Sequence, residues 1–117
     1  MLNKERIYAL AREVGFSLCG VAKCRYLDVS HRHFDQWLTR GDGDGLEYMQ
    51  RNIEKRFDPS QLVEGAKTVI VCALNYRNPI TNGYAAEAHC KIASYACTID
   101  YHHTIKAMLH EMFARLR

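Results

Sequence analysis

The sequence has no long hydrophobic run and no marked excess of charge of either sign. No apolar stretch within its 117 residues approaches the length of ~18 residues that is needed to span a membrane. Lys4, Glu5 and Arg6 interrupt the N-terminal segment, where a secretory signal would be apolar. Its 16 basic and 13 acidic residues are scattered, not clustered as in dedicated nucleic-acid-binding proteins. We therefore expect a soluble, cytoplasmic protein with no membrane partner.

The cysteines also lack the regular spacings of a disulfide framework or a metal cluster. Their number is odd, and no two form the C-x2-C pair that is typical of zinc and iron–sulfur sites. Among the nearby histidines, His102 and His103 are adjacent at a predicted helix start and point in different directions. We therefore expect no metal site and free thiols. The residues that could have suggested a zinc site are His89, Cys90, Cys97, His102 and His103.

Apolar periodicity predicts a helix near each end of the chain. Asn3 is a favoured N-cap, residues 7–14 repeat apolar positions at helical spacing, and Gly15 is a favoured stop. A second stripe runs over 101–116, directly after Asp100, which is another favoured cap. No Gly or polar tail closes that stripe, so we expect the fold to be incomplete at the C-terminus.

Shorter elements are expected between these helices. Ser30 is the expected cap of a helix that ends at Gly41, and residues 46–55 are expected to form another. Asp58 is a favoured N-cap, and Pro59 is favoured at the first position of a helix. Together they predict a short helix that ends near Gly65.

Strand patterns indicate a small mixed sheet. Residues 67–74 form a continuous run of mainly β-branched apolar residues, which is typical of a strand buried on both faces and predicts the centre of the sheet. Residues 16–22 and, more weakly, 91–97 are candidate neighbouring strands. Turn signals make 75–88 a loop at the end of the main strand. The expected fold is a single α/β (α+β) domain over 1–117, with helices packed on a small mixed sheet.

Several short segments carry polar and aromatic side chains suited to binding a ligand. In order and spacing, these segments resemble the N-terminal domain of the epoxyqueuosine reductases, cobalamin-dependent iron–sulfur enzymes of transfer-RNA modification. The resemblance covers nearly the whole chain. The segments are LEYM at 46–49, EKRFDP at 54–59, GA at 65–66, LNY at 74–76, SYA at 94–96 and DYH at 100–102.

The resemblance implies a reaction in which reduced cobalamin attacks the epoxide of a modified wobble base in tRNA, so that oxygen is lost and queuosine forms. Asp100 then corresponds to the acid that protonates the departing oxygen. Such a carboxyl needs a raised pKa, which burial beside a corrin ring would provide. The alternative for Asp100 is a purely structural N-cap. His102 is expected to orient Asp100 or to contact the cofactor.

Three further residues are candidates for binding the cofactor. Arg56 has a planar donor fork that suits a polar cofactor edge or a phosphate, and its alternative is a surface ion pair with Glu54 or Asp58. Asn75 and Tyr76 follow the main strand and offer amide and phenol hydrogen bonds to corrin side chains. Tyr76 is alternatively a rim residue.

The sequence departs from the family pattern in two respects. Thr98 occupies a position where the family commonly has Gly, so the loop before Asp100 is expected to differ in shape. The closely spaced cysteines of the family's iron–sulfur domain are absent, so we expect this chain to be the N-terminal part of such a reductase. Alone, it should bind cobalamin weakly or not at all and should not turn over. tRNA and the C-terminal iron–sulfur domain are the expected partners.

One rival interpretation is a non-catalytic binding or interaction module that retains the fold. Another is a fragment of a flavin reductase, although no Gly-rich phosphate loop supports it. The sequence does not determine the oligomeric state.

Overall fold

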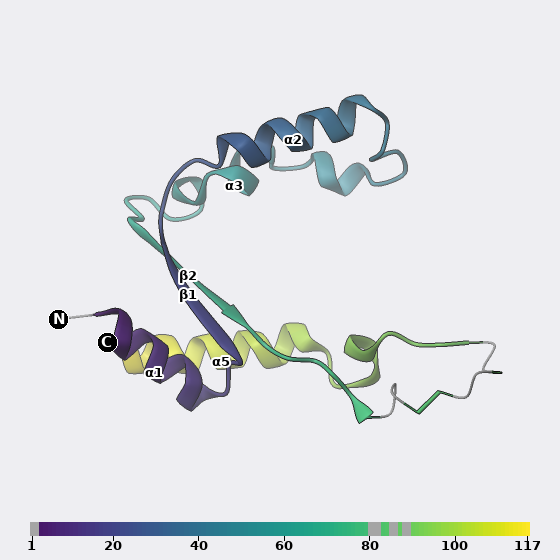
Figure 1. Cartoon of the computed structure of the whole chain (residues 1–117). Helices are drawn as coiled ribbons and strands as arrows, with labels where there is room; N and C mark the ends of the chain where they lie inside the picture. Colours follow the sequence, from purple (N-terminus) through teal and green to yellow (C-terminus); the bar gives the residue numbers. More distant parts are fainter. Residues whose placement is uncertain (1–2, 80–82, 85–86, 88–89) are drawn as a thin grey trace. The chain divides into compact units, whose positions relative to one another are not determined.

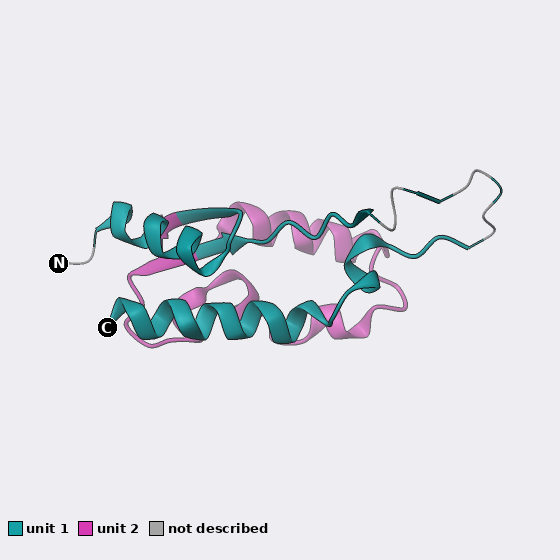
Figure 2. Ribbon diagram, turned by 90° about the horizontal axis from the view of Figure 1, so that it is seen from below, with its two compact units in different colours: residues 1–20, 71–117 teal, residues 21–70 magenta. Residues whose placement is uncertain are grey.

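The computed structural model describes residues 3–79, 83–84, 87 and 90–117 (Figure 1). The chain divides into two compact units (Figure 2). Unit 1 comprises Met1–Gly20 and Val71–Arg117, and unit 2 comprises Val21–Ile70.

Unit 1 contains the two helices that the sequence predicts near the chain ends. Helix α1 spans Lys4–Val14 and α5 spans Tyr101–Leu116. The side chain of Asn3 accepts a hydrogen bond from the Arg6 amide at 2.9 Å, and Gly15 ends α1 at φ 109°. This left-handed backbone favours glycine, which has no Cβ to clash. The predicted caps of α1 are therefore confirmed.

The core of unit 1 lies where α1 packs beside α5 (Figures 1 and 2). Ile7 and Ala11 of α1, Phe16 just after it and Met112 of α5 are buried. Full burial of an Ile, Phe or Met side chain stabilises a fold by about 1.5–3 kcal/mol, so the burial of these residues stabilises unit 1. Arg115 adds a polar contact, because its guanidinium lies 3.6 Å from the Glu13 carboxylate.

The sheet contains two strands among the described residues, β1 (Leu18–Lys23) and β2 (Thr68–Ala73). The strands run antiparallel: the Ser17 amide donates to the Ala73 carbonyl and the Cys24 amide to the Lys67 carbonyl, both at 2.9 Å. Both strands therefore lie close to their predicted positions, and the predicted mixture of helix and sheet is confirmed.

The prediction that residues 67–74 form a sheet centre buried on both faces is wrong for the described structure. Strand β2 has one neighbour, Val69 is half-buried, and Val71 is 57% exposed. A continuous apolar run specifies a strand that can be covered on both faces, but the covering layers must come from elsewhere in the fold. The strand expected at 91–97 is also absent, because Ser94–Cys97 form the 3-10 helix η3.

Unit 2 is built around one buried aromatic ring. Phe57, at the end of α3 (Ile53–Phe57), packs against α2 (Asp28–Thr39). The His31 ring stacks on Phe57 with centroids 4.5 Å apart, and the Phe34 ring lies 5.3 Å away. The Leu27 amide donates to the Phe57 carbonyl at 2.8 Å, which joins the start of α2 to the end of α3.

Several helix boundaries in unit 2 differ from the predictions. Helix α2 begins at Asp28 and has no side-chain cap, so Ser30 lies inside the helix. The helix expected over 46–55 is split into the 3-10 helix η1 (Glu47–Gln50) and α3, because Asn52 has a left-handed backbone with φ 53°. Asp58 does cap the 3-10 helix η2 (Pro59–Gln61), although η2 ends before Gly65.

Within the described ranges, no helix combines the length and the apolar character needed to cross a bilayer.

Candidate functional site

The main candidate site is an open apolar hollow in unit 1, with a volume of about 310 Å³. It forms where the end of β2, helix η3 and the first turns of α5 meet. The loop expected at the end of the main strand contributes here, although residues 80–82, 85–86 and 88–89 of it lie outside the described residues. The hollow is lined by Leu74, Tyr76, Tyr95, Tyr101 and Ile105.

Three tyrosine rings shape this hollow. Tyr76 and Tyr95 meet edge to face with centroids 6.2 Å apart, and Tyr95 and Tyr101 do so at 6.0 Å. All three side chains are substantially exposed. Edge-to-face contacts hold aromatic rings in defined orientations. The tyrosines therefore present a preformed apolar surface with phenol hydroxyls as polar groups.

A second hollow, of about 360 Å³, shares the tyrosines and extends towards Asn75 and Thr98. The backbone amide of Asn75 donates to Ser17 Oγ at 2.9 Å, and its side-chain oxygen accepts from the Arg77 amide at 3.0 Å. These two bonds fix the residue, and its side-chain NH2 makes no hydrogen bond to any described residue. Asn75 therefore offers free donors at the edge of an apolar surface.

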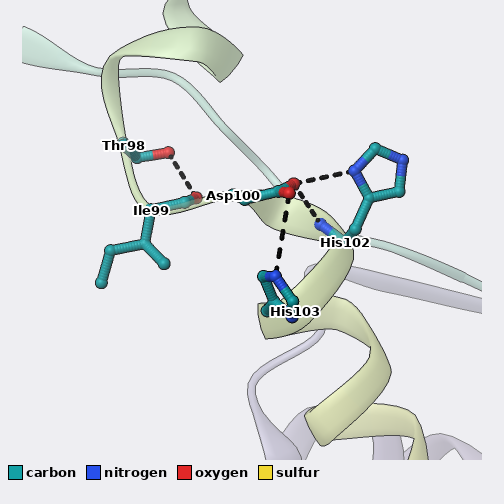
Figure 3. A network of polar contacts seen from close by, with 5 residues as sticks. All are labelled: Thr98, Ile99, Asp100, His102 and His103. Carbon is teal, nitrogen blue, oxygen red and sulfur yellow. Dashed lines mark hydrogen bonds and ion pairs between the residues drawn. The ribbon is translucent and has the colours of Figure 1, made fainter.

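Asp100 and two histidines form a polar network at the start of α5 (Figure 3). One Asp100 carboxylate oxygen accepts the His102 backbone amide at 3.0 Å and lies 2.7 Å from His102 Nδ1. His103 Nε2 lies 4.0 Å from the other oxygen. The predicted N-cap role of Asp100 is thus confirmed, and His102 lies where it can orient the carboxylate.

The hydrogen bonds of this network lower the pKa of Asp100. The backbone amide of His102 is the largest cause and its side chain the second; partial desolvation opposes both. The expected raised pKa is therefore not found in this structure, because the Asp100 side chain is 54% exposed at a helix start. Because an ionised carboxylate can only accept hydrogen bonds, the 2.7 Å contact with an ionised Asp100 requires a hydrogen on His102 Nδ1. Together the two side chains can hold or pass one proton.

Thr98 does not strain the loop before Asp100. Its φ is −128°, an extended conformation that any residue adopts, and its hydroxyl donates to the Ile99 carbonyl at 3.3 Å (Figure 3). A glycine is not required at this position in this backbone. The predicted consequence of replacing Gly by Thr, a differently shaped loop, stays a prediction.

Arg56 lies on α3 in unit 2. Its guanidinium carbon is 5.6 Å from the centroid of the Phe34 ring, a cation–π contact. Within the described residues it forms no ion pair with Glu54 or Asp58, so that alternative is wrong for this structure. Arg56 also lines a hollow of unit 2 with a volume of about 390 Å³.

The structure brings Asn75 and Tyr76 together around the hollows of unit 1, and Asp100 lies between two residues of the lining, Ile99 and Tyr101. Sequence reasoning missed Tyr95 and Tyr101 as site residues, although both are the tyrosines of the SYA and DYH segments. No group of three possible metal-ligating side chains occurs in the part of the chain that the structure describes.

Comparison with known proteins identifies the family. The family described as "Epoxyqueuosine reductase QueG, DUF1730" matches residues 56–117. An epoxyqueuosine reductase from Cellulophaga algicola is 34% identical over 110 residues, which are 94% of this chain and 35% of the relative. One from Cyclobacterium marinum is 36% identical over 107 residues, which are 92% of this chain and 34% of the relative.

A solved structure of epoxyqueuosine reductase from Streptococcus thermophilus matches with a TM-score of 0.81 and 26% identity, over 99% of this chain and 31% of that one. The combination of helices with a small two-stranded sheet is thus one found in an oxidoreductase. The chain belongs to the epoxyqueuosine reductase family and spans about a third of the length of these relatives.

Proposed function

We propose that this chain is the N-terminal, cofactor- and substrate-side part of a cytoplasmic reductase that converts epoxyqueuosine to queuosine in tRNA. The observation that carries the proposal is the Asp100–His102 pair. Asp100 is the sequence neighbour of Ile99 and Tyr101, which line the second hollow, and the pair lies within the stretch that matches the family. In the whole reductase, iron–sulfur clusters of a C-terminal domain outside this chain would supply the electrons, so we expect no turnover by the chain alone.

The hollows of unit 1 fit one edge of a large, flat cofactor such as cobalamin. Their volumes of about 310 and 360 Å³ lie at the low end of small-molecule sites, which span roughly 300–1,000 Å³. Tyr76 and Tyr101 provide an apolar surface, and the free amide donors of Asn75 suit carbonyl groups at a cofactor's rim. Cobalamin, when bound, supplies a nucleophilic metal centre for opening an epoxide. Arg56 is assigned to a polar group of cofactor or substrate.

In this proposal Asp100 donates the proton to the oxygen that leaves the epoxide. Because its pKa is lowered here, the carboxyl must lose solvent when cofactor and substrate bind, since desolvation favours the neutral acid. The proton that Asp100 donates leaves with the departing oxygen, so a new one must come from solvent. His102, whose Nδ1 lies 2.7 Å from the carboxylate, can pass it on to Asp100.

A non-catalytic binding module is the second candidate, and the lowered pKa of Asp100 favours it. In such a module Asp100 only caps α5, and the tyrosine hollows bind a ligand without chemistry.

The replacement Asp100→Asn separates the two candidates. Asn caps a helix about as well as Asp but has no carboxylic proton. In a protein of the relatives' full length, we expect unchanged melting and a turnover lower by roughly 10²–10⁴-fold, as when a general acid is lost. Turnover within about threefold of wild type, far below that range, would leave Asp100 a structural residue.

Cobalamin binding provides an independent measurement. In a spectroscopic titration, the chain alone should bind the cofactor weakly, and Tyr76→Ala should weaken binding by the full-length protein. Tight, stoichiometric binding by the isolated chain would contradict the assignment of this chain to one side of the site.

A further inference from the structure

Three cations converge on the hollow of unit 2. Arg51 follows η1, and Lys55 and Arg56 lie on successive positions of α3. The left-handed Asn52 turns the backbone between them, so cations from two elements line one surface. The lining of this hollow of about 390 Å³ comprises Tyr48, Arg51, Asn52, Lys55, Arg56 and Leu62.

Unlike three other arginines of the chain, these cations have no acidic partner among the described residues, and all three line the same hollow. Arg32 pairs with Asp28 at 3.7 Å, Arg40 with Asp42 at 2.8 Å, and Arg115 with Glu13 at 3.6 Å. By contrast, none of the three cations of the hollow forms an ion pair with a described residue.

The acidic residues of the same segment do not compensate for this charge. Glu47, Glu54 and Asp58 are not part of the lining. Asp58 is engaged elsewhere, because its carboxylate accepts the amide and the hydroxyl of Ser60 at 3.0 and 2.6 Å. The hollow therefore concentrates positive charge, although the segment 47–58 carries three acidic and three basic residues.

An aromatic ring completes the surface. Tyr48 lines the hollow and is 58% exposed, and the structure shows no ring contact for it with a described residue. A planar exposed ring beside unpaired cations is the combination that binds single-stranded nucleic acid, in which cations contact phosphates and the ring stacks on a base.

We propose that this hollow of unit 2 binds the sugar–phosphate backbone of RNA, with Arg51 and Lys55 contacting phosphates and Tyr48 stacking on an unpaired base. Arg56 has part of its charge over Phe34 and contributes a lesser share. The choice of RNA over another polyanion rests on the proposed function. The binding surface itself rests on the charges and the ring.

The test is fluorescence anisotropy with a labelled tRNA anticodon stem-loop and the whole chain, over a range of salt concentrations. Arg51→Gln with Lys55→Gln should weaken binding by roughly tenfold for each charge-assisted hydrogen bond removed. The slope of log K against log salt should fall by about one for each phosphate that is no longer neutralised. Tyr48→Leu should weaken binding without changing that slope.

Arg32→Gln with Arg40→Gln is the matched control, since it removes the same charge from exposed arginines of the same unit. The control should bind RNA as wild type does, and circular dichroism should show that both double variants are folded. Equal losses in the two double variants, or no RNA binding by the wild-type chain, would overturn the proposal.

A second arm separates this proposal from the proposed function. A DNA stem-loop of the same sequence and inorganic pyrophosphate serve as competitors. Preferential binding of RNA supports the proposal, and equal competition by DNA overturns the choice of RNA. Reductase activity of the full-length protein is measured independently. If the full-length protein has no activity, but the double variant still loses RNA binding relative to wild type, only the proposed function is contradicted.

Discussion

The two units of the chain are stabilised in different ways. Unit 1 buries Ile7, Ala11, Phe16 and Met112 where two helices pack together, whereas the buried large side chain of unit 2 among the described residues is Phe57. Apart from α2, unit 2 consists largely of short helices and turns around that ring. The Asp100 network is thus attached to the better-packed unit, and the proposed RNA surface to the less well-packed one.

This difference suits the two proposed tasks. A proton donor needs a fixed geometry, because small misplacements of a catalytic group are costly. A surface that contacts phosphates depends on charge and tolerates adjustment. The following predictions test whether the two units differ as described, in order of decreasing effect on the fold.

The largest effect is expected for Phe57→Ala, which removes the ring that contacts both His31 and Phe34. Replacing a buried Phe by Ala costs about 3–5 kcal/mol. Amide hydrogen exchange should rise throughout residues 21–70, while α1 and α5 keep their protection. Equal loss of protection in both units would show that they unfold together.

A smaller effect is expected for Met112→Ala in unit 1. Met112 is 3% exposed, and its replacement should cost about 2–5 kcal/mol, towards the lower end because the surrounding side chains can partly close the space. Urea unfolding of wild type and variant measures the change. Leu109→Ala on the exposed side of α5 is the control and should change stability much less.

Asp100→Ala should lower the melting temperature by a few degrees near neutral pH, because α5 loses its cap. The folded chain holds the Asp100 pKa below its ordinary value, so the stabilisation is present above that value and is lost as pH falls through the lowered pKa. The melting curves of wild type and variant should therefore converge in acid. A constant difference down to about pH 2, below the ordinary Asp pKa, would contradict the cap as its cause.

The last prediction concerns reactivity and leaves the fold intact. Partial burial, together with the Cys19 thiol 3.9 Å away, raises the pKa of Cys72 to about 11. Because the thiolate is the reactive form, Cys72 should be alkylated at pH 8 roughly 100-fold more slowly than a thiol of ordinary pKa. Peptide mapping by mass spectrometry should find the exposed Cys90 modified first. Modification of Cys72 at a similar rate would show that this end of the sheet opens readily.

Elements with strong local signals were predictable from the sequence. Asn3 and Gly15 delimit α1 as expected, and Asp100 caps α5, because a cap needs only its own turn of helix. The break at Asn52 was not predictable, since a left-handed Asn inside a helical pattern has no sequence signal of its own.

The burial of β2 and the shape of the site depend on distant contacts. The composition of β2 indicates a strand whose two faces can both be buried. It does not indicate which segments of the chain pack against those faces. The tyrosine hollow likewise requires Tyr76, Tyr95 and Tyr101 to meet from three elements. Their places in the LNY, SYA and DYH segments were visible in the sequence, but their edge-to-face arrangement was not.

The hydrogen bond from the His102 amide to Asp100 links the chemistry of this residue to the mechanics of α5. Whatever stabilises the ionised carboxylate also stabilises the first turn of the helix, and the coupling is reciprocal. A proton that arrives at Asp100 therefore weakens the bond that keeps that turn wound. If Asp100 is an acid, then every reaction cycle loosens and retightens the beginning of α5, and Tyr101, one residue later, moves with it. The conformation of the first turn of α5 then depends on whether Asp100 is protonated.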